Sequence, residues 1–447
     1  MREVDTLVRA GTLVTMDEAE TVIPDAAVAI SGGEIVGVGP EAEISGRFRG
    51  KEEIGGSDRI AMPGLINAHV HMADSLFRGL VEDLPLKPWL ERLWVAERRF
   101  VSEESVRLGA DLALAEMIRG GITTALDMFW FPESGALAAR EAGFRLITGP
   151  LYFDFDAPDG LAADVRTERG REWLERWAHD PLIVPCVQPH NAMTVSPEYM
   201  REARALADEF GVLFHTHCAE TAAEVASTRE RFGTTPVGHL ASLGVLDDRT
   251  ALAHCIHLTD EDVDTLAGSG AAAIHNPLSN LKLGSGIMPL GKLRIAGVPV
   301  LLGTDGPVSG NDLDMWTAMR FAGLLQRGVH RDPDLTPSVD TLRMVTRDAA
   351  RSLGLGALTG SIEAGKRADI ILLETERPHL LPRYDVFAHL AYTVGRDDVA
   401  TVLIDGRTVM RDRELLTLDE RAAMDGVRAL AEGVASFMAG ADVGPTG

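Results

Sequence analysis

Three features are scarce in this chain, and each scarcity narrows the class of protein. Only three cysteines occur among 447 residues, Cys186, Cys218 and Cys255, and so sparse and odd a set indicates buried thiols in a reducing compartment. Lys and Arg number 43 against 67 Asp and Glu, and the net charge of -24 argues against nucleic acid or an anionic membrane as partner. No apolar run is long enough for a spanning helix, and Met1–Asp5 is not a signal peptide. We therefore expect a cytoplasmic protein.

Both ends of the chain carry short β patterns without chemical motifs. Near the N-terminus, residues 7–16, 27–30 and 34–39 predict strands, with Ser31-Gly32-Gly33 as a hairpin turn. Matching β patterns recur at residues 368–373 and 399–407, and the tail from Leu418 to Met438 has helical periodicity. These patterns predict one composite β-sandwich domain, built from residues 1–57 and 363–447.

The central segment, residues 58–362, alternates strands with helices, which is typical of a parallel α/β barrel. After a first strand that carries Pro63–His71, seven more are predicted at 122–128, 145–151, 183–189, 212–217, 250–255, 271–275 and 298–304. Eight strands predict a (β/α)8 TIM barrel, in which catalytic residues lie at the C-terminal ends of the strands.

The first barrel strand ends in two histidines with one residue between them. His69 and His71 point to the same side because strand side chains repeat with period two. Two neutral imidazoles at this spacing can bind one metal ion, although such pairs also line polar barrel mouths without a metal.

Polar residues at the ends of three later strands strengthen the metal interpretation. His217 is the natural third ligand, whereas His215, deeper in the same strand, favours a packing role. Asp305 would be a costly buried acid unless it is paired with a cation. Three imidazoles and one carboxylate with room for water form a catalytic rather than a closed structural site.

Two further residues near this cluster could handle water and protons. Glu220 follows His217 by three residues and could move a proton from a water molecule, although an acid at the start of a helix is also favoured electrostatically. His254 could polarise the substrate or hold the attacking water. No lysine occurs between Lys87 and Lys282, so a carboxylated lysine cannot bridge two metals at the end of strand four, and we expect one ion.

These residues resemble the amidohydrolase superfamily over nearly the whole chain. Within it the chain is similar to the branch of methylthioadenosine/S-adenosylhomocysteine deaminases, guanine deaminases and triazine hydrolases. The stretches that most resemble adenosine-type deaminases are residues 76–90, 276–286 and 311–315.

The resemblance implies a role for each matching residue. His69, His71, His217 and Asp305 would bind zinc, or iron in some relatives, while Glu220 shuttles protons and His254 and Asp305 hold water. Substrate contacts would come from Glu82, which would bind ribose hydroxyls, and from His190 and Trp89. The sequence departs from the pattern after strand three, where residues 149–156 are aromatic and acidic instead of carrying arginines that read an amino-acid carboxylate.

The sequence therefore predicts a metal-dependent hydrolase that releases ammonia from an adenosine-type nucleoside: methylthioadenosine, 5′-deoxyadenosine, adenosine or S-adenosylhomocysteine. Asp154 and Asp156 would repel a carboxylate, so we expect neutral 5′-substituted adenosines to be preferred. One alternative is hydrolysis of an s-triazine at the same site, and another is a catalytically dead scaffold, which the complete ligand set disfavours. We expect a small-molecule substrate, no nucleic-acid or membrane partner, and a homo-oligomer.

Overall fold

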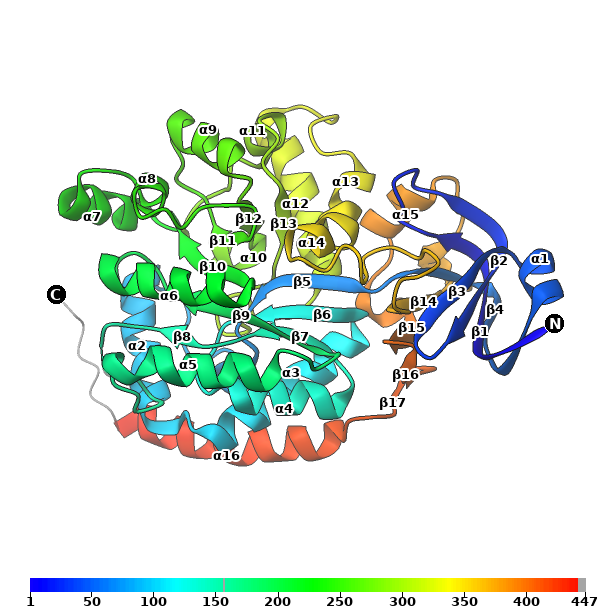
Figure 1. The fold of residues 1–447 in the computed structure, drawn as a ribbon, viewed down its shortest axis with the longest axis horizontal. Coiled ribbons are helices and arrows are strands. Elements are labelled where there is room, and N and C mark those ends of the chain that lie inside the picture. The colour runs from blue at the N-terminus through cyan, green and yellow to red at the C-terminus, as the bar shows by residue number, and fades with distance from the viewer. Residues whose placement is uncertain (156, 441–447) are drawn as a thin grey trace.

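The computed structural model describes residues 1–155 and 157–440, in which a barrel of parallel strands lies beside a separate sheet made from both chain ends (Figure 1). The barrel strands are β5 (Leu65–Val70), β6 (Ile122–Asp127), β7 (Arg145–Thr148), β9 (Ile183–Pro189), β10 (Leu213–Cys218), β11 (Thr250–His254), β12 (Ala272–His275) and β13 (Val300–Leu302), with β8 (Leu151–Tyr152) paired to β9. Beyond β13, the amide of Asp305 donates to the carbonyl of His69 at 3.0 Å and brings the last strand against the first. The (β/α)8 prediction is confirmed, since every predicted barrel strand has its counterpart here.

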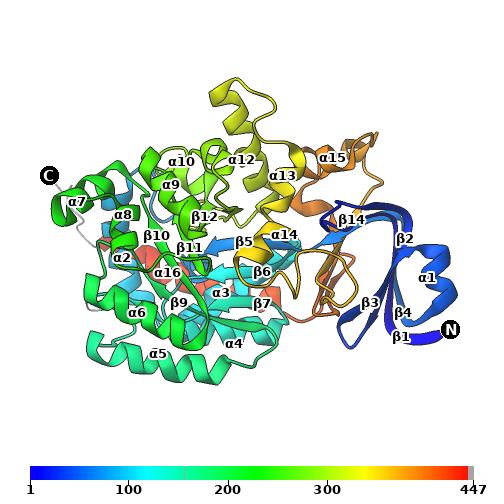
Figure 2. The same ribbon diagram turned by 45° about the horizontal axis from the view of Figure 1, so that its top comes forward.

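Helices surround the barrel strands (Figure 2), and a few of the helices lie at the end of the barrel where the strands finish. They are η1 (Met72–Phe77), α2 (Leu86–Phe100), α3 (Glu103–Arg119), α4 (Pro132–Ala142), α5 (Ala163–Trp177), α6 (Pro197–Phe210), α7 (Ala222–Phe232), α8 (Pro236–Ser242), α9 (Asp260–Ser269), α10 (Pro277–Lys282), α11 (Leu290–Ile295), α12 (Met315–His330), α13 (Ser338–Arg343) and α14 (Arg347–Ser352). Because barrel strands are covered on both faces, β5, β6 and β10 are buried along their whole length. Several helices start at a residue suited to cap them; in α3 the Ser102 hydroxyl accepts from the amide of Ser105.

The chain ends form one eight-stranded sheet; both termini contribute to it, as expected, although the sequence patterns predicted a β-sandwich for this unit. Its strands are β1 (Arg2–Val14), β2 (Val22–Ser31), β3 (Glu34–Pro40), β4 (Phe48–Pro63), β14 (Ile370–Glu374), β15 (Val399–Ile404), β16 (Arg407–Arg411) and β17 (Glu414–Leu415). The short helices in these segments are α1 (Glu41–Arg47), η2 (Pro378–Leu380), α15 (Val386–Tyr392) and η3 (Arg396–Asp398). In the hairpin between β2 and β3, Gly32 and Gly33 have φ of 59° and 79°, a conformation that glycine adopts without strain.

The passage from the terminal sheet to the barrel lies a few residues later than the predicted boundary at 57/58. Residues 60–63, which the sequence suggested as the lead into the first barrel strand, belong to β4 and pair with β14. Gly64 then separates β4 from β5. A side chain at this position would collide with Thr123, whose Oγ1 lies 2.1 Å from the place of a Cβ, so only glycine fits the turn into the barrel.

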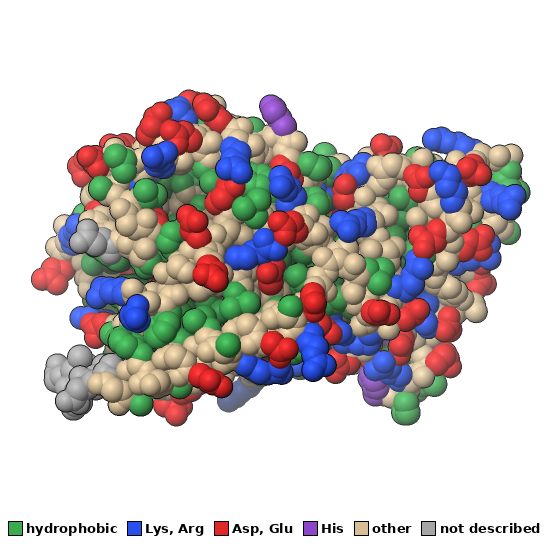
Figure 3. Space-filling view, turned by 90° about the horizontal axis from the view of Figure 1, so that it is seen from below, with side chains coloured by type: hydrophobic (Ala, Val, Ile, Leu, Met, Phe, Trp, Pro, Cys, Tyr) green, Lys and Arg blue, Asp and Glu red, His purple; other side chains and the backbone are tan. Residues whose placement is uncertain are grey.

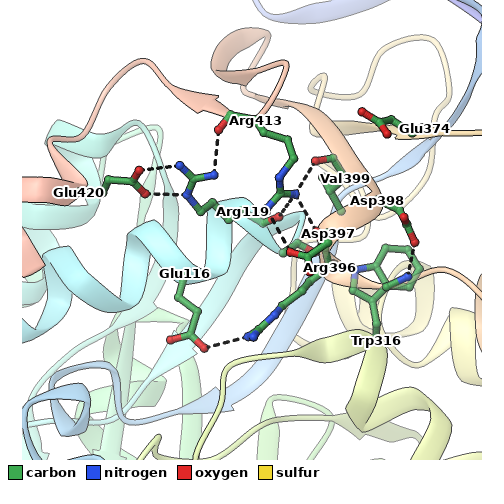
Figure 4. Close-up of polar contacts among 12 residues, drawn as sticks. Glu116, Arg119, Trp316, Glu374, Arg396, Asp397, Asp398, Val399, Arg413 and Glu420 are labelled. Atoms are coloured by element: carbon green, nitrogen blue, oxygen red, sulfur yellow. Dashed lines mark hydrogen bonds and ion pairs between the residues drawn. The ribbon is translucent and has the colours of Figure 1, made fainter. Parts of the chain in front are cut away.

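The C-terminal helix α16 (Glu420–Gly440) returns to the barrel and packs on α3, along the bottom of Figure 1. The guanidinium of Arg119 on α3 pairs with both carboxylate oxygens of Glu420 at 2.6 Å and donates to the carbonyl of Arg413 at 2.8 Å (Figure 4). Val434 is buried in the same apolar cluster as Trp89 and Leu93 of α2. The tail thus supports α2, a helix that the active site uses.

The surface of the protein carries charges of both signs. Acidic and basic side chains are interspersed over the face seen from below (Figure 3). Among the described residues, no helix is both long and apolar enough to cross a membrane.

Candidate active site

Four side chains converge where the barrel strands end. His69 is the second-last residue of β5, His71 follows that strand directly, His217 lies near the end of β10, and Asp305 follows β13. The Asp305 Oδ1 atom lies 3.3 Å from Nε2 of His69 and 3.2 Å from Nε2 of His71. One nitrogen from each of the three histidines lies within 4.8 Å of the others, a spacing suited to one metal ion.

Backbone and side-chain acceptors turn the three imidazoles so that Nε2 faces the centre. The Nδ1 atom of His71 contacts the carbonyl of Met128, and Nδ1 of His217 donates to the carbonyl of His190 at 2.8 Å. For His69 the partner is His215: because Nδ1 of His215 donates to the carbonyl of Ala251 at 2.9 Å, its Nε2 is left to accept from Nδ1 of His69, also at 2.9 Å. Such contacts orient metal-binding histidines and set their tautomer.

Two of the three histidines and the carboxylate have the protonation that a cation requires, whereas contact with Asp305 outweighs burial and raises the pKa of His71 to about 10. Burial lowers the pKa of His69 to about 4 and holds the pKa of His217 well below its usual value, so both rings are neutral ligands at pH 7. Burial alone would raise the pKa of Asp305, but the adjacent imidazoles of His69 and His71 hold it well below the usual range. Nε2 of His69 is buried without a hydrogen-bond partner among the described residues, as expected of an atom that awaits a metal.

Residues of α10 hold the two groups beside this cluster. The Ser279 hydroxyl donates to Oδ2 of Asp305 at 2.6 Å, and Asn280 Oδ1 lies 2.8 Å from Nδ1 of His254. His254 and Asp305 have φ of 77° and 63°, in the left-handed region that ordinary residues avoid. This strain lies where two catalytic candidates leave their strands, a common place for backbone strain in active sites.

Glu220 lies opposite His254 on the wall of the same cavity. Its Oε2 is 3.7 Å from Nε2 of His254, and burial raises its pKa to about 7. The loop that carries it is tied down by Glu224, whose carboxylate accepts from the amides of Ala219 and Glu220 at 3.0 and 2.7 Å. A buried carboxyl with a pKa near neutrality can take up and release a proton in one reaction cycle.

Above these groups the cavity is mainly apolar. Its wall is formed by Leu86, Trp89, Leu90, Leu93, Trp94, Met128, Phe129, Trp130, Leu151, Phe153 and Leu283, with Asn191 and Ser309. His190 stacks on Phe153 with ring centroids 4.4 Å apart, and burial lowers its pKa to about 3. A flat, neutral heterocycle fits such a wall.

Of the three substrate-binding residues that the sequence suggested, two line the cavity and one does not. Trp89 and His190 line the cavity, but Glu82 is absent from its lining residues and instead forms an ion pair with Lys282 at 2.8 Å. Asp154 is exposed, and Asp156 lies outside the described residues.

Two acids in the cavity were not predicted. Glu97 on α2 is buried with a pKa raised by burial to about 7, and its Oε2 receives a long hydrogen bond from Trp130 Nε1 at 3.4 Å. Asp74 of η1 is also buried, and burial, together with the charge of Glu97, raises its pKa well above the usual value. For Glu97 the one signal in the sequence is its spacing, four residues after Leu93 on the same helix face, and the structure shows that this face is buried.

Comparisons with known proteins identify the family of this chain. The family model described as "Amidohydrolase family" matches residues 60–409. The 5-methylthioadenosine/S-adenosylhomocysteine deaminase 1 of Syntrophus aciditrophicus is 42% identical over 435 residues, which cover 97% of this chain and 98% of that protein. The 5-methylthioadenosine/S-adenosylhomocysteine deaminase of Syntrophobacter fumaroxidans is 39% identical, with 96% and 98% covered.

Solved structures share the whole fold. An adenosine deaminase from Xanthomonas campestris with bound zinc superposes with a TM-score of 0.95 at 36% identity, covering 97% of this chain and 99% of that one. The atrazine chlorohydrolase of Arthrobacter aurescens, complexed with zinc, gives 0.89 at 25% identity, with 95% and 100% covered. The chain belongs to the amidohydrolase family and is a hydrolase that acts on carbon–nitrogen bonds other than peptide bonds.

Proposed function

We propose that the protein is a hydrolytic deaminase of adenosine-type nucleosides, the class of methylthioadenosine, 5′-deoxyadenosine, adenosine and S-adenosylhomocysteine. The observation that carries this proposal is the position of Glu220, a buried acid with a pKa of about 7 that lines an aromatic cavity 3.7 Å from Nε2 of His254. The names of the relatives support the same substrate class.

In the proposed reaction, His69, His71, His217 and Asp305 hold one divalent cation. When bound, this cation acts as a Lewis acid that lowers the pKa of water and makes a nucleophile available near neutral pH. The fit rests on the donor set and on the unpartnered Nε2 of His69.

The remaining steps are carried by side chains of this chain. Glu220 takes a proton from the attacking water and delivers it to the ring nitrogen beside the amine-bearing carbon. His254 and Asp305, each fixed by a residue of α10, hold the oxygen as it adds to that carbon. Glu220 then moves the proton of the added hydroxyl to the amine, so that ammonia leaves and the carbon keeps a carbonyl oxygen.

For substrate binding we propose Trp89, His190 and Glu97. The heterocycle would lie among the aromatic side chains beside His190, and the carboxylate of Glu97 would accept hydroxyl hydrogens of the ribose. Glu97 takes the place that the sequence suggested for Glu82, because it lines the cavity and lies within hydrogen-bond reach of Trp130.

The finer expectations belong to the same proposal. Zinc is favoured over iron because two of the similar solved structures are described with zinc. We also propose a cytoplasmic homo-oligomer that binds a small-molecule substrate and no nucleic acid.

The direct test is ammonia release from methylthioadenosine, 5′-deoxyadenosine, adenosine and S-adenosylhomocysteine by the metal-loaded enzyme. We expect turnover of adenosines, with neutral 5′ substituents preferred because the cavity wall is apolar. S-adenosylhomocysteine is the necessary comparison because it carries an amino-acid carboxylate, and Arg98 is a cation that lines a second hollow beside Trp94 and Phe155. If none of the four compounds releases ammonia, the proposal is wrong.

A second candidate function is hydrolysis of an s-triazine, which the likeness to the atrazine chlorohydrolase favours. The same nucleophile could attack an electron-poor triazine ring and expel chloride or an alkylamine. Chloride release from atrazine, measured beside ammonia release from adenosine, separates the two candidates.

A further inference from the structure

Three polar side chains meet outside the cavity, and each comes from a different loop at the barrel mouth. Glu82 follows η1, Lys282 ends α10, and Asn311 lies in the segment between β13 and α12. Lys282 Nζ lies 2.8 Å from Glu82 Oε2 and 2.6 Å from Asn311 Oδ1, while Asn311 Nδ2 donates to Glu82 Oε1 at 3.2 Å. Every member of this trio therefore contacts the other two.

Each member of the trio is next to, or close to, a residue that shapes the cavity wall. Glu82 follows Val81, whose carbonyl accepts from Nε1 of the wall residue Trp89 at 3.1 Å. Lys282 precedes the wall residue Leu283. On the third loop, Lys282 Nζ also donates to the carbonyl of Val308 at 3.1 Å, directly before the wall residue Ser309.

The same loops carry groups that act on the reaction. The loop of Asn311 begins at Asp305, and α10, which ends at Lys282, supplies the Ser279 and Asn280 contacts to Asp305 and His254. Arg78 strengthens the connection between the first and third loops by donating to the carbonyl of Asn311 at 3.0 Å. Because Ser279 and Asn280 hold Asp305 and His254 directly, a shift at the ends of these loops would move mainly the cavity wall.

The trio contributes little to global stability. The side chains of Lys282 and Glu82 are 21% and 38% exposed, and ion pairs with this exposure add little to the free energy of unfolding. Asn311 has a φ of 67°, so the third loop contains a left-handed backbone conformation that most residues avoid. Contacts of this kind matter for where the loops lie rather than for whether the chain folds.

We propose that Glu82, Lys282 and Asn311 form a loop latch, a set of positioning residues that holds three parts of the cavity wall in fixed positions relative to one another. The latch acts through Trp89, Leu283 and Ser309 and does not touch the substrate. This inference rests on the proposed function of the cavity, and it gives Glu82 a role different from ribose binding.

The first experiment compares steady-state kinetics of Glu82→Gln, Lys282→Met and the double variant. Each single variant should raise KM by about tenfold with kcat nearly unchanged, because a displaced wall weakens binding of ground and transition state alike. Since both residues act in one unit, the double variant should be no worse than the worse single variant. Glu363→Gln is the matched control; it removes a Lys366 pair of similar exposure (17% and 46%) and should leave KM unchanged.

A comparison of two substrates distinguishes the latch from direct binding. The latch predicts that Glu82→Gln raises KM by the same factor for adenosine and for 2′,3′-dideoxyadenosine, which lacks both hydroxyls. If the variant harms only adenosine, or if the two single effects add fully in the double variant, Glu82 binds the substrate and the latch is refuted.

Hydrogen exchange gives a readout that needs no substrate. In Glu82→Gln, backbone amides of residues 277–286 and 305–313 should exchange faster than in the wild type, while those of α5 and α6 stay unchanged. Unchanged exchange in both loops would overturn the latch. A wild type that deaminates no adenosine would instead overturn the proposed function, and the exchange result would still decide the latch.

Discussion

The reaction end of the cavity and its substrate-facing wall are built in different ways. At the reaction end, His69, His217 and Asp305 come from strands or strand ends of one barrel, and each is fixed by a neighbour at the barrel mouth. The wall comes from α2 and from loops, and most of its contacts are apolar. The catalytic groups thus lie on the rigid barrel, whereas the residues that select the substrate lie on α2 and on loops, as is common in barrel enzymes.

The largest effect is expected from removal of one ligand at the reaction end. His217→Ala should lose most bound metal and nearly all activity together, because three ligands remain and the cavity gains a void. Metal analysis of desalted protein, in parallel with turnover, checks this. Full metal content in the variant would remove His217 from the ligand set, and two ions per wild-type chain would contradict a mononuclear site.

A smaller effect is expected from the residue behind a ligand. His215→Phe keeps the ring volume but removes the acceptor for Nδ1 of His69, so metal affinity should fall by about 10- to 100-fold. Competition with a chelator measures it. His239→Phe is the control; His239 is a buried histidine of α8 that stacks on Phe232 of α7, and this variant should bind metal like the wild type.

Changes at Glu97 in the cavity wall should alter KM and the pH dependence of KM. Below about pH 7 Glu97 becomes protonated and can no longer accept two hydroxyl hydrogens, so KM for adenosine should rise as pH falls from about 8.5 to about 5.5. Glu97→Gln should show a KM about tenfold higher at the alkaline end and little pH dependence. Glu91→Gln, an exposed acid on the same helix, should retain the wild-type profile.

The same carboxyl should affect stability in the opposite direction. Because burial raises its pKa above the unfolded value, ionised Glu97 destabilises the fold above about pH 7, and this cost disappears as pH falls below the unfolded value. Glu97→Gln should therefore unfold at higher denaturant concentration than the wild type at alkaline pH. An equal or lower midpoint there would show that Glu97 is not a strained, buried acid.

The contrast between the two regions also explains what could be predicted from the sequence. His69, His71, His217 and Asp305 were found because a buried strand predicts the direction of its side chains and the position of its end. The barrel strands were recognisable for the same reason, from short apolar runs between helical patterns.

The wall and the supporting contacts were harder to predict because they depend on distant parts of the chain. Glu97 is one acid among many, and only the burial of α2 against η1 and the aromatic side chains brings it to the cavity. The contact between His215 and His69 joins strands far apart in sequence, so His215 looked like a packing residue. Glu82 matched a family stretch, but the direction of its side chain is set by Lys282 and Asn311.

The central claim, that Glu220 moves the proton in a metal-dependent deamination, is tested most directly by Glu220→Gln. The variant and the wild type are brought to equal metal content, and ammonia release from methylthioadenosine is measured for both. We predict unchanged metal binding and a loss of kcat of about 10²- to 10⁴-fold, because glutamine cannot accept the proton. A variant that keeps more than about a tenth of wild-type turnover at equal metal content would contradict the account.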